Sequence, residues 1–161
     1  MPQRLLSVFV PVFVLLASSA ALADKLDPGA AAPIEAIYAG INANDSTKIA
    51  AAYGADATIV DEFAPFHWSG PKAVASFWSD FAAFTKSAGA SNFHGSHANP
   101  TFVSYDTAKT SAYVVMPTTF TYRLKGKAQT ETGRWVFVLK KGASGWRVSL
   151  SAWATVSDTG A

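Results

Sequence analysis

One short segment, Asp56-Ala57-Thr58-Ile59-Val60-Asp61, has the composition of a buried strand that ends in a carboxylate. Side chains alternate between the two faces of a strand, so Ala57, Ile59 and Asp61 share one face, which is apolar apart from Asp61. If this face points inward, Asp61 lies at the end of an apolar cavity, where desolvation raises its pKa. If the strand ends in water, Asp61 is an ordinary exposed aspartate.

Helical patterns flank this segment on both sides. A first helix is expected to begin at Pro33, because proline suits a first helical turn, and a second, short helix is expected between Asp45 and Gly54. The longest helix is expected from Gly70-Pro71 to Gly89. Its apolar stripe is typical of core packing and consists of Val74, Phe77, Trp78, Phe81 and Phe84.

The rest of the chain is predicted to form long strands, at residues 92–103, 108–123, 129–141 and 146–156. Pro100 and Pro117 interrupt two of them, which favours bulges or edge positions that curve a sheet. Helices followed by a run of strands indicate an α+β fold. We expect a cone-shaped, curved antiparallel sheet wrapped around the long helix, with two further N-terminal helices.

Composition excludes several classes of function. The chain has 13 basic and 11 acidic residues, and this near-neutrality argues against nucleic-acid binding, which usually needs a concentrated basic surface. The absence of cysteine excludes disulfides, thiolate chemistry and iron–sulfur ligation. His94 and His97 are an odd number of residues apart, so in a strand they face opposite ways and do not form a metal site. We therefore expect neither a metal nor a cofactor.

The first 23 residues have the pattern of a cleavable signal peptide. Arg4 provides the positive start, residues 5–16 are apolar, and Ala21-Leu22-Ala23 provides a small–x–small cleavage site. A transmembrane anchor is the alternative, but the apolar run is short for spanning a bilayer. The mature protein is then expected to begin at Asp24 without a membrane anchor and to be exported, in a bacterium to the periplasm. Residues 24–32 are expected to be a flexible lead-in, and residues 33–157 a single domain.

Four segments share their pattern with a known superfamily. They are Ile41-Asn42-Ala43-Asn44-Asp45, Tyr53-Gly54-Ala55-Asp56-Ala57-Thr58-Ile59-Val60-Asp61, Ser69-Gly70 with Ala73-Val74-x-x-Phe77-Trp78, and Trp135-Val136-Phe137-Val138 with Gly145-Trp146-Arg147-Val148. In these segments the chain resembles the nuclear transport factor 2-like superfamily, in its SnoaL-like and ketosteroid isomerase-like branch. The resemblance covers nearly the whole mature chain and implies the cone fold. It does not name a reaction, because the superfamily contains isomerases, dehydratases, cyclases, hydrolases and binding domains.

The resemblance places Asp61 where steroid isomerases of this family hold the base that removes a proton beside a carbonyl. Their two donors to the developing enolate, a tyrosine and a protonated aspartate, fall at Ile37 and near Trp135 here, so steroid isomerisation itself is not expected. Tyr53 and Trp78 are alternative pocket donors. For both residues the favoured interpretation is a core aromatic with one hydrogen bond.

His94 lies about where dehydratase-like members of the superfamily place a pocket histidine. A His94–Asp61 acid/base pair is one interpretation, and a surface histidine near a strand end is the other. By resemblance, alternate residues of two late strands line the cone, and their aromatic, sparsely polar character favours a flat apolar ligand. The candidate ligand-binding residues are Trp78, Met116, Thr118, Phe120, Trp135 and Phe137.

These observations predict an exported, cofactor-independent SnoaL-like domain that binds a small apolar molecule in its cone. Isomerase or lyase chemistry is one interpretation, with Asp61 as general base and His94 and Tyr53 as assisting catalytic residues. The alternative is a non-catalytic module for ligand binding or dimerisation. Relatives commonly pair through the outer face of the sheet, so the resemblance also implies a homodimer.

Overall fold

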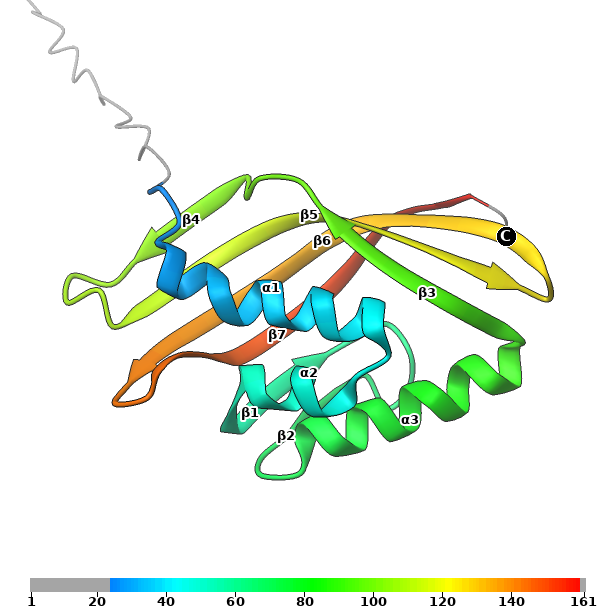
Figure 1. The fold of residues 1–161 in the computed structure, drawn as a ribbon, viewed down its shortest axis with the longest axis horizontal. Coiled ribbons are helices and arrows are strands. Elements are labelled where there is room, and N and C mark those ends of the chain that lie inside the picture. The colour runs from blue at the N-terminus through cyan, green and yellow to red at the C-terminus, as the bar shows by residue number, and fades with distance from the viewer. Residues whose placement is uncertain (1–23, 160–161) are drawn as a thin grey trace, which may run out of the picture.

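The computed structural model describes residues 24–159, and the predicted signal peptide at residues 1–23 lies outside them. Figure 1 shows a curved sheet with three helices on one side. The elements are α1 (Pro28–Ala43), α2 (Ser46–Ala52), β1 (Tyr53–Val60), β2 (His67–Ser69), α3 (Ala73–Ala88), β3 (Ala90–His97), β4 (Phe102–Tyr105), β5 (Ser111–Leu124), β6 (Lys127–Gly142) and β7 (Gly145–Thr159). None of the helices in this part of the chain is long and apolar enough to cross a membrane.

Helix α1 begins at Pro28, not at Pro33 as predicted. The carboxylate of Asp27 caps it by accepting a hydrogen bond from the backbone N–H of Gly29 at 2.8 Å. Proline at the first helical position is favourable, because the N–H that it lacks would have no partner within the helix. Residues 28–32, predicted to belong to a flexible lead-in, are therefore helical.

The other two helices lie in the predicted regions, although α3 begins at Ala73 and not at Gly70-Pro71. Asp45 caps α2 by accepting a hydrogen bond from the backbone N–H of Lys48 at 3.0 Å. This helix ends at Ala52, and Gly54, predicted to close it, is already part of β1. Helix α3 ends at Ala88 and is capped by Gly89, whose left-handed φ of 75° is accessible to glycine at little cost.

The sheet has the strand order β2-β1-β7-β6-β5-β3, and β4 pairs with β5 beside β3. All neighbouring strands are antiparallel except β1 and β7, which run parallel, so the sheet is mixed. The chain between these two strands contains α3 and the other five strands, which is long enough for the crossover that a parallel pair requires.

The bulge predicted at Pro117 is not present, because β5 pairs with β6 in unbroken register through this residue. On its other edge β5 changes partner here, from β3, which pairs as far as Thr118, to β4, which pairs from Val115. Pro117 therefore lies between the part of β5 that pairs with β3 and the part that pairs with β4. No neighbouring strand needs a backbone N–H at this position, so a proline is tolerated here. Pro100 separates β3 from β4 at the predicted edge. Register shifts occur instead between β6 and β7, between β3 and β5, and between β1 and β7.

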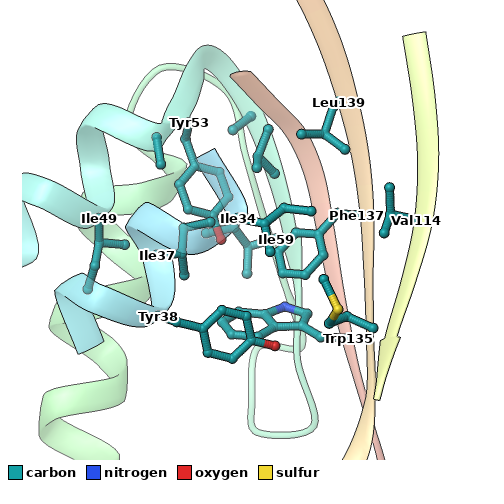
Figure 2. Packing of buried hydrophobic residues seen from close by; sticks show 14 of the residues in the cluster. Ile34, Ile37, Tyr38, Ile49, Tyr53, Ile59, Val114, Trp135, Phe137 and Leu139 are labelled. Carbon is teal, nitrogen blue, oxygen red and sulfur yellow. The ribbon is translucent and has the colours of Figure 1, made fainter. Parts of the chain in front are cut away.

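The core lies between α1 and the concave face of the sheet. Ile34 and Ile37 of α1 are fully buried and point toward β6, where Phe137 is also fully buried (Figure 2). Helix α1 therefore covers this part of the concave face, and α3 lies toward its other end, where Phe77 is buried. This division of the concave face decides which side chains remain available to line a cavity.

Candidate functional site

A cavity of about 300 Å³ lies between α3 and the sheet. Side chains from α3, β3, β5, β6 and β7 form its largely aromatic wall, which includes Trp78, Phe81, Phe93, Phe120, Trp135 and Trp153. Four carboxyl groups also line it: Asp61, Glu62, Glu131 and Asp158. The volume is at the lower end of the range for small-molecule sites.

Asp61 directly follows β1 and brings its carboxylate to the cavity wall. Burial raises the pKa of Asp61 to about 7, because a desolvated carboxylate is disfavoured; the nearby charges of Glu62 and Glu131 add to the rise. The backbone N–H of Glu62, which donates to Asp61 Oδ1 at 2.8 Å, opposes it. Asp61 is therefore about half ionised at neutral pH.

A second feature of the wall is the Thr155 hydroxyl, which lies between two carboxyl groups. Its oxygen is 2.7 Å from Glu131 Oε1 and also within hydrogen-bond distance of Glu62 Oε2. A hydroxyl has one hydrogen, so it donates to one of these carboxyl groups and the other must supply its own proton. Burial raises the pKa of Glu131, and the hydrogen bonds that it accepts from Thr155 and Trp153 oppose this rise. The indole N–H of Trp153 also donates to Glu131 Oε1, at 2.7 Å.

Asp158 completes the acidic part of the wall. Its Oδ2 accepts a hydrogen bond from the Tyr122 hydroxyl at 3.2 Å. Desolvation, followed by the charge of Asp158, raises the pKa of Tyr122 to about 12, so this phenol remains a neutral donor. The cavity thus joins an aromatic wall to a group of carboxyl groups held by Thr155, Trp153 and Tyr122.

Of the residues predicted to contact a ligand, three line this cavity together with Asp61: Trp78, Phe120 and Trp135. The indole nitrogen of Trp78 is buried, and no acceptor for its hydrogen is present in the described part of the chain. Trp78 is therefore a wall residue with an unsatisfied donor.

The structure places Met116, Thr118 and Phe137 in the core instead of at the cavity wall. All three are buried, and the Thr118 hydroxyl is 2.6 Å from the hydroxyl of Tyr38 on α1. The reason is the position of α1, which covers the part of the concave face from which these side chains project. The alternation of side chains along a strand correctly predicted that these residues face the concave side of the sheet. It could not predict which part of that side α1 covers.

Tyr53 and His94 do not reach the cavity wall either. Tyr53 is buried, and its hydroxyl lies 3.0 Å from that of Ser151. His94 is exposed and pairs with Thr121, whereas the next residue, Gly95, pairs with the wall residue Phe120. Because neighbouring residues face opposite ways, His94 projects from the convex face, and no pair with Asp61 forms.

Three carboxyl groups of the cavity, Glu62, Glu131 and Asp158, are not among the predicted site residues. Strict alternation assigns Glu62 to the face opposite Asp61, but β1 ends at Val60, so the alternation does not continue there. Asp158 lies beyond the predicted end of the last strand and after a register shift. Glu131 was detectable, since its spacing of four residues from Trp135 places both on one strand face.

Within residues 24–159, no group of three or more histidine, aspartate or glutamate side chains is arranged to hold a metal ion.

No protein-family model and no curated protein matches the sequence. Solved structures do match. A ketosteroid isomerase-like protein from Erwinia carotovora atroseptica aligns over 80% of this chain and 94% of its own, with 18% identity and a TM-score of 0.62. The type 2 hexachlorocyclohexane dehydrochlorinase LinA aligns over 80% and 86%, with 13% identity and a TM-score of 0.64.

A scytalone dehydratase-like protein from Novosphingobium aromaticivorans aligns over 80% of this chain and 82% of its own, with 14% identity and a TM-score of 0.65. At such identities the likeness concerns the fold. The chain adopts the α+β cone fold of the nuclear transport factor 2-like superfamily, as the sequence resemblance implies.

Proposed function

We propose that this chain binds a small, largely apolar molecule in the cavity and uses Asp61 as a general base in cofactor-independent isomerase or lyase chemistry. One observation carries the proposal: a carboxylate at the wall of an aromatic cavity, with its pKa raised by burial to about 7. Such a base is stronger than an aspartate in water and is still substantially ionised at neutral pH. The names of structural neighbours, an isomerase-like protein and a dehydrochlorinase, are compatible with proton removal from carbon.

In this proposal the ionised Asp61 removes a proton from a carbon next to an electron-withdrawing group. The negative charge that develops on the substrate needs a hydrogen-bond donor in the same cavity. Trp78 is the candidate donor, because its ring lines the cavity and its indole N–H has no acceptor among the described residues. The nitrogen is buried in the structure, so the ring must rotate slightly to present this N–H to the ligand. The positions that hold a tyrosine and a protonated aspartate in steroid isomerases carry Ile37 and Trp135 here, so a steroid enolate is not the expected intermediate.

Hydrogen exchange with solvent tests the base without knowledge of the natural substrate. The protein is incubated in deuterium oxide with an aromatic ketone, and NMR follows loss of the signal from hydrogens next to the carbonyl. The exchange rate should rise with pH through about 7, as Asp61 ionises, and should fall about 100-fold or more in Asp61→Asn. Asp56→Asn is the matched control, because Asp56 is exposed on β1 and lies outside the cavity wall. Unchanged exchange in a folded Asp61→Asn protein would remove the base from the proposal.

Export to the periplasm is part of the proposal and is supported by the signal-like pattern of residues 1–23 alone. Mass spectrometry of the protein secreted by a bacterial host should give a chain that begins at Asp24. A chain recovered only in the cytoplasm with its first 23 residues attached would contradict this part.

A non-catalytic dimerisation module is the second candidate function. The observation in its favour is the convex face of the sheet, where Tyr113 and Phe102 are 42% and 40% exposed with ring centroids 6.0 Å apart. Large exposed aromatic side chains often mark protein interfaces. Sedimentation should then show a homodimer that Tyr113→Glu converts to monomer, and a monomer at high concentration would argue against it.

A further inference from the structure

The four carboxyl groups of the cavity have no basic partner. None of the described residues that line the cavity is lysine, arginine or histidine. The salt bridge found in residues 24–159 joins His97 to Glu35, neither of which lines the cavity. Since the whole chain has slightly more basic than acidic residues, the excess of negative charge is local. Asp61 and Glu131 are partly buried, and a partly buried carboxylate without a counter-charge is unfavourable, whereas Glu62 and Asp158 are exposed.

The aromatic wall adds a second kind of attraction for positive charge. The faces of aromatic rings carry a negative electrostatic potential that attracts ammonium groups within about 6 Å. The ring of Trp153 is 5.2 Å from that of Phe120, and its N–H donates to Glu131, so wall and carboxyl groups meet at the same place. On the other side, the ring of Phe93 stacks on Tyr122, which contacts Asp158.

We propose that the ligand of this cavity is a small organic cation, an amine or quaternary ammonium compound with an aromatic or other apolar body. This inference rests on the proposed binding function of the same cavity and narrows its ligand to one chemical class. The apolar body lies against the rings of α3 and the sheet, and the cationic group lies near Glu131 and Asp158. A neutral molecule of equal shape leaves the carboxyl groups without a counter-charge, and an anion meets like charge.

Binding of such a cation should be coupled to loss of protons from the carboxyl groups of the cavity. Burial disfavours the ionised forms of Asp61 and Glu131, and it raises the pKa of both groups, that of Asp61 to about 7. A bound cation favours their ionised forms, so binding releases protons. Titration calorimetry in two buffers of different ionisation enthalpy measures that release directly.

The test compares three probes with one aromatic body: naphthylethylamine, naphthylethanol and naphthylacetate. Calorimetry on the protein near pH 7 should show the amine binding about tenfold more tightly than the alcohol, with proton release, and the acetate binding most weakly. If the alcohol binds as tightly as the amine, the cation proposal is wrong while the binding function stands. If none of the three binds, both proposals fail.

Two variants assign the preference to the carboxyl groups. Glu131→Gln and Asp158→Asn keep the shape of the wall, and each should weaken amine binding about fivefold and leave alcohol binding unchanged within about twofold. Asp56→Asn changes the same charge outside the cavity and should affect neither probe. Equal losses for amine and alcohol would assign these residues to packing and overturn the proposal.

Discussion

Replacement of Asp61 by asparagine should stabilise the protein, and more so as the pH rises. Burial raises the pKa of Asp61 from 3.8 to about 7. Between these values the folded protein keeps a proton that the unfolded chain has lost. The unfolded state therefore binds fewer protons, so the free energy of unfolding falls as the pH rises through this range. Asparagine does not ionise, so the Asp61→Asn protein does not lose this part of its unfolding free energy as the pH rises.

The magnitude follows from the size of the shift. A displacement of about three pKa units corresponds to roughly 4 kcal/mol, and solvent at the partly open cavity screens some of it. The stability of Asp61→Asn relative to the wild type should therefore increase by about 2–4 kcal/mol between pH 4 and pH 8. The hydrogen bond from the backbone N–H of Glu62 is retained, because the oxygen of an asparagine amide also accepts.

Urea unfolding followed by tryptophan fluorescence at the two pH values measures this difference, with Asp56→Asn as control. The titration of Glu131 is common to all three chains and cancels in the comparison to first order. If Asp61→Asn changes stability equally at pH 4 and pH 8, the reasoning about a desolvated carboxylate is refuted. If Asp61→Asn is more stable than the wild type and no longer catalyses exchange of the ketone hydrogens with solvent, the base lowers the stability of the folded protein.

Three further substitutions test the frame that holds the site. Asp27→Ala removes the cap of α1 and should lower the unfolding free energy by about 1 kcal/mol in urea titrations; an unchanged value would contradict the capping role. Phe137→Ala opens a fully buried position and should cost about 3–5 kcal/mol in the same assay. Gly133→Ala places a methyl group within 2.6 Å of Trp153 Cζ2, so it should cost about 1–3 kcal/mol and weaken probe binding, and full affinity would show that the wall adapts.

Much of the fold was predictable because local signals agree with tertiary packing. The aromatic stripe and terminal Gly89 of α3, and the apolar alternation of β1, have the same meaning in the isolated sequence as in the folded chain. The start of α1 was missed because its cap, Asp27 before Pro28, lies in a segment rich in glycine and alanine. At Pro117 the local rule was correct, since neither β3 nor β4 pairs with this residue and no strand there needs its missing N–H. The predicted bulge was wrong because the pairing with β6 continues unbroken on the other edge.

The site was less predictable because it depends on the pairing register between strands and on which parts of the sheet the helices cover. Alternation along one strand was sufficient to direct Asp61 inward. The direction of His94 depends on its pairing with Thr121, and nothing in its own segment reveals that pairing. Likewise Asp158 reaches the cavity after a shift in the pairing of β6 and β7, and Thr118 is hidden by a helix far away in sequence.

The central claim is that Asp61 is a desolvated carboxylate in a ligand cavity. Its pKa is measured directly by NMR titration of the side-chain carboxyl carbons, with Asp61→Asn to assign the signal. We predict a midpoint near 7, together with a downward shift when naphthylethylamine is bound. A midpoint near 4, the ordinary value for aspartate, would place this carboxylate in water and contradict the assignment of Asp61 as the base.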